Sequence, residues 1–322
     1  MNLTTLKKVL REYRDKSLAV ANSLGGGGRL RILCSMLYCT VRYGARPIDY
    51  ERFEFRRKSA FERNRYMTFL RYFKIAQKID RKTFAEISGN KSRELEVFSD
   101  FISRDWMLID NSTSEDEIKR FITSHDALIA KPEHGEQGHG IFKLKTQDDI
   151  DRLLKERMAE SFIIEEVVEN ADYIKEINPS SLNTIRAYTF INNMGETEIL
   201  AILLRVGAPG TNVDNWGAGG VGYNFDIETG ICCQKGTDKK CRRHIFHPGS
   251  GKMMLGFKIS NFDELKKYIE RLSNVIPSAR FVGWDIAITP KGLELIEMNC
   301  PGGHDFLQCH GEPFYDRIIK NW

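Results

Sequence analysis

A chain of 322 residues, 41% hydrophobic and 11% aromatic, is long enough for two domains or for one elaborate domain with a large core. Its longest apolar run, Ile32–Val41, is broken by Ser35 and Thr40 and is too short to span a bilayer, and we find no secretory signal at the N-terminus. The seven cysteines, an odd number, therefore predict free thiols in a reducing, cytoplasmic location.

The net charge of +4 is unevenly distributed. Residues 1–82 carry 20 Lys and Arg against 7 Asp and Glu, a charge of +13, which leaves −9 for the remainder. Two interpretations stay open: the solvated exterior of helices, or a surface for an anionic partner such as a nucleotide sugar, a lipid phosphate or a membrane. The chain has no RNP-type or helix-turn-helix signature, so we do not expect a nucleic acid partner.

Residues 1–82 are predicted to form a basic, mainly helical N-terminal region. Residues 2–14 carry a helical apolar stripe, and a second stripe follows later, made of Tyr66, Phe69, Leu70 and Phe73. The glycines at 25–28 break the first helical stretch. They do not form a P-loop, because no Lys-Ser or Lys-Thr pair follows them.

The character of the chain changes from residue 83. A short helix follows Lys91, and Ser114 to Glu117 form a capping box that opens another helix. Strands predicted at 127–130 and 141–144 flank a glycine-rich hairpin that contains Gly135, Gly138 and Gly140. Glycines let backbone N–H groups approach phosphate oxygens, and Lys131 adds a positive charge beside them.

Further elements follow in order. We predict a helix at 148–160, an apolar strand at 162–169 that runs into acidic residues, and alternating strands from Asn183 to Ile191 and from Ile199 to Val206. A polar loop contains Asp214 and Asn215, and a helix at 261–272 has Asn261 as its predicted N-cap. Between them lie three cysteines and two histidines that could form a zinc cluster: Cys232, Cys233, Cys241, His244 and His247. Because their spacing lacks a C-x₂-C pair, we favour core thiols and surface histidines over a zinc site.

The stretch 281–303 predicts two strands joined by a tight turn centred on Lys291. With this centre, Asp285 lies opposite Glu297 and Gly283 lies opposite Asn299, about 5 Å apart at Cβ. Apolar neighbours on both faces favour buried strands over an exposed hairpin with scattered acids. Two buried carboxylates need a cation or a proton, and ligands with only oxygen donors suit Mg²⁺ or Mn²⁺.

Taken in order, these motifs resemble the ATP-grasp superfamily over about residues 83–310, and in particular its sugar-transfer-associated branch. The patterns that carry the resemblance are Lys91, Lys131 with its glycine flap, the strand at 165–168, the motifs at 183–186 and 214–220, and Gly283-Trp284-Asp285 with Glu297 and Asn299. The resemblance implies an α+β fold in which two α+β subdomains clasp ATP. It places an ATP-grasp domain at 83–322, with a glycine-flap subdomain at about 106–168 and a metal-binding subdomain at about 169–322.

The resemblance also implies roles for individual residues. Lys91 and Lys131 would contact the α- and β-phosphates under the flap made by Gly135, Gly138 and Gly140. The adenine would lie against Glu165, Glu166, Val167 and Val168, and the ribose against Asp172, with Glu169 or Glu176 as alternatives. Mg²⁺ would be held by Asp285, Glu297 and Asn299, and substrate by Asn183, Asp214, Asn215, Gly219 and Gly220. Because Gly283 stands where relatives often carry an arginine, Arg186 or Arg205 would hold the acyl-phosphate, and Arg186 is slightly preferred.

The implied activity is an ADP-forming ligation of a carboxylate with an amine through an acyl-phosphate. The branch suggests small-molecule substrates, an amino acid or amine and a sugar acid, in surface-polysaccharide assembly, with a sugar nucleotide or lipid-linked glycan as a further partner. Three alternatives stay open: a small-molecule kinase, a peptide ligase of another pathway, and a non-catalytic binding module. Peripheral membrane contact through the basic region also stays open, and the sequence does not indicate an oligomeric state.

Overall fold

The computed structural model describes residues 3–22, 28–79, 87, 89–135, 140–211, 214, 219–310 and 313–322. The chain divides into two compact units. We call them the helical unit, which comprises Met1–Ile79, Asn192–Glu196 and Gly303–Trp322, and the α+β unit, which comprises Asp80–Ile191 and Thr197–Gly302. Among the described helices, none is long and apolar enough to cross a membrane.

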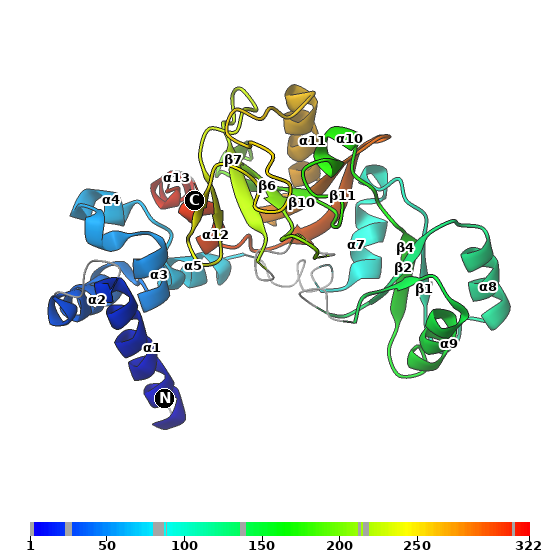
Figure 1. Ribbon diagram of the computed structural model, residues 1–322, viewed down its shortest axis with the longest axis horizontal. Coiled ribbons are helices and arrows are strands. Elements are labelled where there is room, and N and C mark those ends of the chain that lie inside the picture. The colour runs from blue at the N-terminus through cyan, green and yellow to red at the C-terminus, as the bar shows by residue number, and fades with distance from the viewer. Residues whose placement is uncertain are drawn as a thin grey trace. The chain divides into compact units, whose positions relative to one another are not determined.

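The helical unit contains short helices from both ends of the chain (Figure 1). Its elements are α1 (Leu3–Asn22), α2 (Arg29–Tyr43), α3 (Pro47–Arg52), η1 (Phe55–Arg57), α4 (Ala60–Asn64), α5 (Phe69–Ala76), α12 (Asp305–His310) and α13 (Tyr315–Asn321). Helix α1 extends beyond the predicted residue 14, because the buried Ser17 and Ala21 continue a spacing of four residues along its packed face.

An aromatic cluster forms the core of the helical unit. Its members are Tyr43, Tyr50, Phe53, Phe55 and Tyr66, with ring centroids 4.9 to 6.3 Å apart. Helix α3 begins at Pro47, and the buried Asp49 caps it by accepting a hydrogen bond of 2.9 Å from the backbone N–H of Arg46. Asp49 also accepts one from the N–H of Phe69, which ties α5 to α3.

The C-terminal segment packs with the helical unit, whereas the sequence had suggested that residues 83–322 form one domain. Gln308 exchanges two hydrogen bonds with the backbone of Met67, of 2.7 and 2.9 Å. Arg65 forms an ion pair with Asp316 at 3.2 Å. These contacts join positions about 250 residues apart, and no local pattern in the sequence predicts them.

The α+β unit contains two sheets (Figure 1). Its helices are α7 (Lys91–Val97), η2 (Ser99–Phe101), α8 (Glu115–Thr123), α9 (Gln147–Glu156), α10 (Asp172–Lys175) and α11 (Phe262–Val275). Its strands are β1 (Trp106–Ile109), β2 (Leu128–Pro132), β3 (Phe142–Leu144), β4 (Phe162–Glu166), β5 (Thr184–Ile191), β6 (Thr197–Val206), β7 (Val221–Phe225), β8 (Gly236–Asp238), β9 (Arg243–His244), β10 (Phe281–Thr289) and β11 (Gly292–Asn299).

The smaller sheet has the order β1-β4-β2-β3, with antiparallel neighbours. Helices α8 and α9 pack on one face through Ile118 and Leu153, which meet Ala130, Phe162 and Ile164 in one core. Since side chains alternate along a strand, Lys131 and Glu165 project from the opposite face. The packing of the helices thus leaves a charged face free for a site.

The larger sheet has the order β11-β10-β5-β6-β7-β8-β9. Its registers pair Asp285 with Arg186 and with Glu297, and Thr184 with Arg205. Paired residues share a face, so these charged side chains lie on one side of the sheet. The alternate residues of β5 and β10, such as Ala187 and Trp284, are buried on the other side, and α11 packs against β5 and β6.

In the β10–β11 hairpin Asp285 pairs with Glu297 and Gly283 with Asn299, as predicted. The turn and the register that lead to this pairing differ from the prediction. The turn is at 290–291, so Thr289 pairs with Gly292 and Ile286 with Leu295. A bulge then leaves Ile296 without a partner and brings Glu297 opposite Asp285. In an unbroken ladder Glu297 would pair with Trp284 and point to the apolar face, so the bulge is what turns its carboxylate toward Asp285.

Two predicted helix starts have different outcomes. The capping box at Ser114 is confirmed, because its side chain accepts a hydrogen bond from the N–H of Glu117 and the Glu117 carboxylate accepts one from Ser114. Asn261 stands at the N-cap position of α11 as predicted, but with φ 52°, and its side chain makes no cap hydrogen bond. Asparagine tolerates this left-handed conformation, which explains its presence there without a cap.

Candidate active site

The charged faces of both sheets border a cavity of about 420 Å³ within the α+β unit. Its charged lining consists of Lys91, Glu94, Arg104, Lys131, Lys143, Glu165, Arg205, Asp214, Asp285 and Glu297. A second cavity of about 170 Å³ is lined by the end of β4 and the residues after it, and shares Lys131, Glu165 and Ile296 with the first. Because they share these lining residues, we describe the two cavities together as the candidate site.

Two lysines lie at one wall. Lys91 is the first residue of α7, whose N-cap Asn90 accepts a hydrogen bond of 3.0 Å from the N–H of Arg93. Its Nζ donates to the carbonyl oxygens of Pro132 at 2.9 Å and Gly135 at 3.0 Å. Burial, with Lys131 as a further cause, lowers the pKa of Lys91. Two ammonium groups this close favour an anion between them.

Glu165 is the acid that faces these lysines, and both of its carboxylate oxygens are already in ion pairs. Its carboxylate pairs with Lys131 on one side and with the Nε of Arg104, at 3.1 Å, on the other. Burial opposes its ionisation, but Lys131 and Arg104 outweigh burial and hold the pKa of Glu165 below its ordinary value. Glu165 therefore positions Lys131 and does not offer a free charge to the cavity.

Arg104 was not predicted by the sequence analysis. Its side chain is buried, and its Nη1 donates to Glu294 at 2.8 Å and to the carbonyl oxygen of Leu295 at 2.8 Å. It thereby joins β4, through Glu165, to β11. The separation of about 190 residues from Glu294 leaves no local signal from which to find this arginine.

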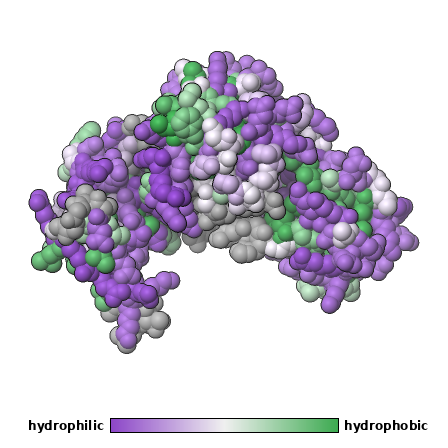
Figure 2. Space-filling view, viewed as in Figure 1, coloured by the Kyte–Doolittle hydropathy of each residue, from purple (hydrophilic) through white to green (hydrophobic). Residues whose placement is uncertain are grey.

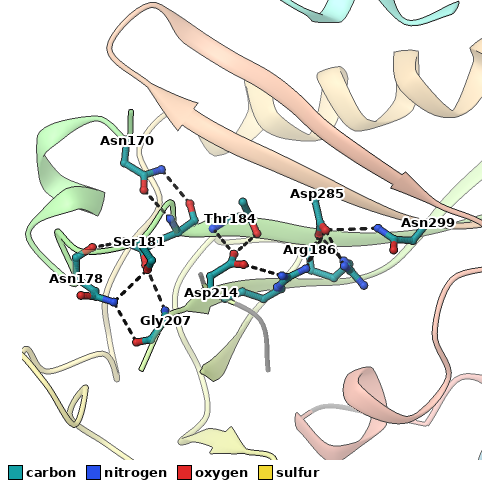
Figure 3. Close-up of polar contacts among 11 residues, drawn as sticks. Asn170, Asn178, Ser181, Thr184, Arg186, Gly207, Asp214, Asp285 and Asn299 are labelled. Atoms are coloured by element: carbon teal, nitrogen blue, oxygen red, sulfur yellow. Dashed lines mark hydrogen bonds and ion pairs between the residues drawn. The ribbon is translucent and has the colours of Figure 1, made fainter. Parts of the chain in front are cut away.

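Asp285 accepts hydrogen bonds from two guanidinium groups, those of Arg186 and Arg205, and Figure 3 shows it facing Arg186. Arg186 donates to both carboxylate oxygens, with Nη2 to Oδ2 at 2.7 Å, and Nη1 of Arg205 lies 2.8 and 2.9 Å from the two oxygens. Burial opposes ionisation of Asp285, but the two arginines outweigh it and lower its pKa. Asn299 adds a longer contact, with its Nδ2 3.4 Å from Oδ2 of Asp285.

Glu297 is the carboxylate that remains available. It is exposed toward the cavity, and among the described residues none donates a hydrogen bond to it. Dehydration in the cavity, and then the charge of Asp285, raise the pKa of Glu297. A cation at this point would relieve the repulsion between the two acids.

The donor chemistry of this corner fits Mg²⁺ or Mn²⁺. Glu297 offers a free carboxylate, Asn299 an amide oxygen whose NH₂ already points to Asp285, and all donors are oxygens. Asp285 fits on one condition: its oxygens are occupied by guanidinium donors, so direct coordination requires one arginine to turn away.

A short chain of polar contacts positions Arg205. Asp214 accepts from Nη2 of Arg205 at 2.6 Å and, with its other oxygen, from the backbone N–H of Thr184 at 3.0 Å and from the Thr184 hydroxyl (Figure 3). Burial raises the pKa of Asp214 even though Arg205 counteracts it. Arg205 lines the cavity and Arg186 does not, which is the reverse of the preference drawn from the sequence.

Asn183 has a different place from the one the motif suggested. It is buried and lines neither cavity. Its N–H donates to Asn170 at 2.7 Å, its Nδ2 donates to the carbonyl oxygen of Asn178 at 2.9 Å, and its Oδ1 accepts from Ser181 at 3.1 Å. These bonds join the loops before β5 to one another, as the neighbouring contacts in Figure 3 also do.

The second cavity is lined by the residues predicted to contact adenine: Glu165, Glu166, Val167 and Val168. The N–H of Val167 already donates to the carbonyl oxygen of Ala127 at 3.0 Å, so this amide is not free for a base. Of the acids predicted for the ribose, Glu169 lines the cavity, whereas Asp172 is exposed on α10 and does not. Lys175 pairs with Glu169 at 2.7 Å.

The glycines divide into two groups. Gly135 lines the cavity, while Gly140, Gly219 and Gly220 line neither cavity. Gly140 has φ 73°, and a Cβ there would lie 2.7 Å from Cγ of Pro132, so both backbone conformation and space require glycine. Gly138 and Asn215 lie outside the described residues.

The cysteines and histidines between residues 232 and 247 make separate contacts. His247 is buried, with Nε2 3.0 Å from the carbonyl oxygen of Gly207, which corrects its interpretation as a surface residue. His244 is bound to Asp238 at 3.2 Å. Cys232 is buried, and burial raises the pKa of its thiol to about 11.

Two sheets that present lysines and acids to a common cavity agree with the ATP-grasp fold that the resemblance predicted. The chain belongs to the sugar-transfer associated ATP-grasp family, which matches residues 83–317. Comparison with curated proteins gave no match.

Solved structures similar to this chain include two synthetases and one ATP-grasp ligase. An N5-carboxyaminoimidazole ribonucleotide synthetase in complex with ADP has a TM-score of 0.46 and 12% identity, with 71% of this chain and 52% of that chain covered. The ATP-grasp ligase PsnB with a minimal precursor has a TM-score of 0.46 and 15% identity, with 76% and 63% covered. D-alanyl-alanine synthetase A from Vibrio cholerae O1 biovar eltor has a TM-score of 0.44 and 14% identity, with 72% and 59% covered. The match thus spans between half and two thirds of each of these chains.

Proposed function

We propose that this protein is an ATP- and Mg²⁺-dependent ligase that joins a carboxylate to an amine and releases ADP. The observation that carries the proposal is the cavity in which Lys91 and Lys131 stand at one wall and Asp285, Glu297 and Arg205 at another. Membership of an ATP-grasp family supports the same conclusion. The glycine-flap subdomain at about 106–168 and the metal-binding subdomain at about 169–322 belong to this proposal.

The lysine wall would bind the phosphates of ATP. Lys131 is held by Glu165, and Lys91 by carbonyl oxygens, so both ammonium groups are positioned before nucleotide arrives. Adenine would occupy the second cavity beside Val167 and Val168, with Glu169 toward the ribose. The flap around Gly135 would close over the phosphates.

The metal corner would be Glu297, Asn299 and Asp285. In the described part of the chain no group donates a hydrogen bond to the carboxylate of Glu297 or to the amide oxygen of Asn299, and Asp285 becomes available when one guanidinium leaves it. A divalent cation bound there would supply charge neutralisation for the terminal phosphates.

Arg205, and Arg186 behind it, would act on the reacting group. In the first step a substrate carboxylate oxygen bonds to the γ-phosphorus and the bond to ADP breaks. In the second step an amine bonds to the acyl carbon, loses a proton, and phosphate leaves with both electrons of its C–O bond. Guanidinium donors that leave Asp285 for the acyl-phosphate would stabilise the oxyanion of this second step.

The substrates we propose are a sugar acid or related carboxylate and an amino acid or amine, joined in surface-polysaccharide biosynthesis in the cytoplasm. The support is the description of the family as sugar-transfer associated. A sugar nucleotide or lipid-linked glycan as carrier of the carboxylate belongs to the same proposal. Asp214 and Thr184, which line the cavity beside Arg205, would contact the carboxylate substrate.

A screen of ADP release tests the proposal, with sugar acids crossed against amino acids and amines in the presence of ATP and Mg²⁺. We expect release only when carboxylate and amine are present together, and an amide product by mass spectrometry. Stoichiometric ADP release with a hydroxyl compound and no amine would instead identify a kinase on the same scaffold. Absence of ADP release together with absence of nucleotide binding would contradict the assignment of the cavity.

A further inference from the structure

Helix α2 carries two apolar stripes on opposite sides, and only one of them is packed. The packed stripe has the spacing i, i+4, i+7, i+11 and consists of Ile32, Met36, Cys39 and Tyr43. The other has the same spacing and consists of Leu30, Cys34, Leu37 and Val41. Leu30 is 74% exposed, Leu37 48% and Val41 89%.

The packed stripe fixes the rotation of α2, so the second stripe is not a part of the core turned outward. The ring of Tyr43 lies 6.2 Å from that of Phe55 in the aromatic cluster. On the same helix Thr40 is hydrogen-bonded to Tyr13 of α1, and Ser35 accepts from the hydroxyl of Tyr50 at 3.0 Å. Rotating α2 to bury Leu37 and Val41 would break all of these contacts.

The charge around the exposed stripe has one sign. Arg29, Arg31 and Arg42 are exposed, and α2 contains no acidic residue. Within the described part of the chain none of these three arginines forms an ion pair. In Figure 2 green groups interrupt the purple surface around α2. An unpaired basic rim around an exposed apolar stripe is the pattern of a helix that lies in a membrane interface.

We propose that α2 docks on an anionic lipid surface, with Leu30, Leu37 and Val41 in the interface and the three arginines on headgroup phosphates. The positive charge of the three arginines favours an anionic lipid surface over the two other occupants considered for this stripe, a second copy of the chain and a nucleic acid. A second copy of the chain packed through this stripe by a two-fold axis would set the arginine rims of both copies against each other. A nucleic acid would satisfy the arginines but leave the apolar stripe in water. The proposal does not depend on the proposed ligase activity.

Vesicle co-sedimentation of the full chain tests the proposal. We expect binding to vesicles of phosphatidylglycerol and phosphatidylcholine, weaker binding at 0.5 M salt, and at least tenfold weaker binding to phosphatidylcholine alone. Leu37→Asp combined with Val41→Asp, and separately Arg31→Glu combined with Arg42→Glu, should each reduce binding at least tenfold. Arg31→Lys combined with Arg42→Lys should retain it, because a headgroup requires charge and not a fixed fork.

Met158→Asp is the matched control, since Met158 is 61% exposed in the α+β unit, and its vesicle binding should equal that of the wild type. Thermal unfolding and nucleotide binding without vesicles should be unchanged in all variants, which separates this proposal from the proposed function. Equal binding to neutral and anionic vesicles, or wild-type binding by Leu37→Asp with Val41→Asp, would overturn the proposal. A dimer in solution that Val41→Asp dissociates, without vesicle binding, would overturn it in favour of a second copy.

Discussion

Asp285 binds two guanidinium groups with one carboxylate. This arrangement determines whether Arg205 affects the rate of the reaction or the affinity for nucleotide. Arg205 is shared between Asp285 and Asp214, and it borders the cavity. A guanidinium held by two acids keeps its orientation and loses little freedom when it transfers a hydrogen bond to a new oxyanion. Its effect should therefore appear in the rate and not in the affinity for nucleotide.

Arg205→Ala should leave ATP binding nearly intact and reduce turnover by about 10²-fold or more, the usual effect of a lost oxyanion donor. Arg205→Lys should not restore the rate, because an ammonium group cannot reproduce two parallel N–H bonds. Calorimetry of nucleotide binding beside steady-state rates makes the comparison, with thermal unfolding to confirm that the variant folds. Normal turnover by Arg205→Ala, or an equal loss of nucleotide affinity, would remove Arg205 from the chemical step.

Glu94 gives a prediction about pH. It is buried, accepts a hydrogen bond from the N–H of Met298 at 2.5 Å, and has its pKa raised to about 8 by burial and then by Glu297. An unfolded glutamate has a pKa near 4.5. Between these values the folded protein binds a proton that the unfolded chain has lost. The free energy of unfolding should therefore fall as pH rises from about 5 to about 8, by up to about 1.4 kcal/mol per pH unit.

Glu94→Gln should flatten this slope, since glutamine resembles the protonated acid and does not titrate. Urea unfolding at intervals from pH 5 to pH 8, without nucleotide, measures the difference between variant and wild type. Glu96→Gln, at an exposed site paired with Arg93, is the control and should keep the wild-type slope. Equal slopes for Glu94→Gln and wild type would show that Glu94 is not the titrating group.

At the scale of elements, the β10–β11 hairpin shows what could be predicted and what could not. Alternation with a turn centred on Lys291 placed Asp285 opposite Glu297, and the structure has this pairing, but with a turn at 290–291 and a bulge that restores the register. The bulge at Ile296 that produces it could not be predicted, because it depends on the packing of both strands and not on a turn residue. Lys91, Lys131, Asp285 and Glu297 line the cavity and were named from the sequence. Arg104 and Glu94 act through contacts with distant strands and were not.

Arg104 joins β4 to β11, and its removal tests that connection. Arg104→Met leaves Glu294 buried without its ion-pair partner and Glu165 with Lys131 alone, which should cost about 3–5 kcal/mol of the free energy of unfolding. Urea unfolding at pH 7 measures the loss. Arg93→Met, which removes an exposed pair with Glu96, should change the free energy by less than about 1 kcal/mol. A cost for Arg104→Met no greater than for Arg93→Met would show that the buried pair does not hold these elements together.

For the whole molecule, the uneven charge follows the division into two units. The basic residues of the first 82 positions belong mostly to the helical unit, and the carboxylates and lysines of the candidate active site belong to the α+β unit. The change of character near residue 83 was visible in the sequence. The return of Gly303–Trp322 to the helical unit was not, because its contacts with Met67 and Arg65 join the two ends of the chain.

The central claim is that the protein joins a carboxylate to an amine through an acyl-phosphate. The most direct test traces the oxygen atoms of the carboxylate substrate into the products. A carboxylate substrate identified by the ADP-release screen is labelled with ¹⁸O in its carboxyl group and turned over with ATP, Mg²⁺ and the amine. An acyl-phosphate intermediate requires that one labelled oxygen leave with the phosphate, so mass spectrometry should find ¹⁸O in the inorganic phosphate and one ¹⁸O retained in the amide. Unlabelled phosphate with ADP formed, or AMP in place of ADP, would contradict the account.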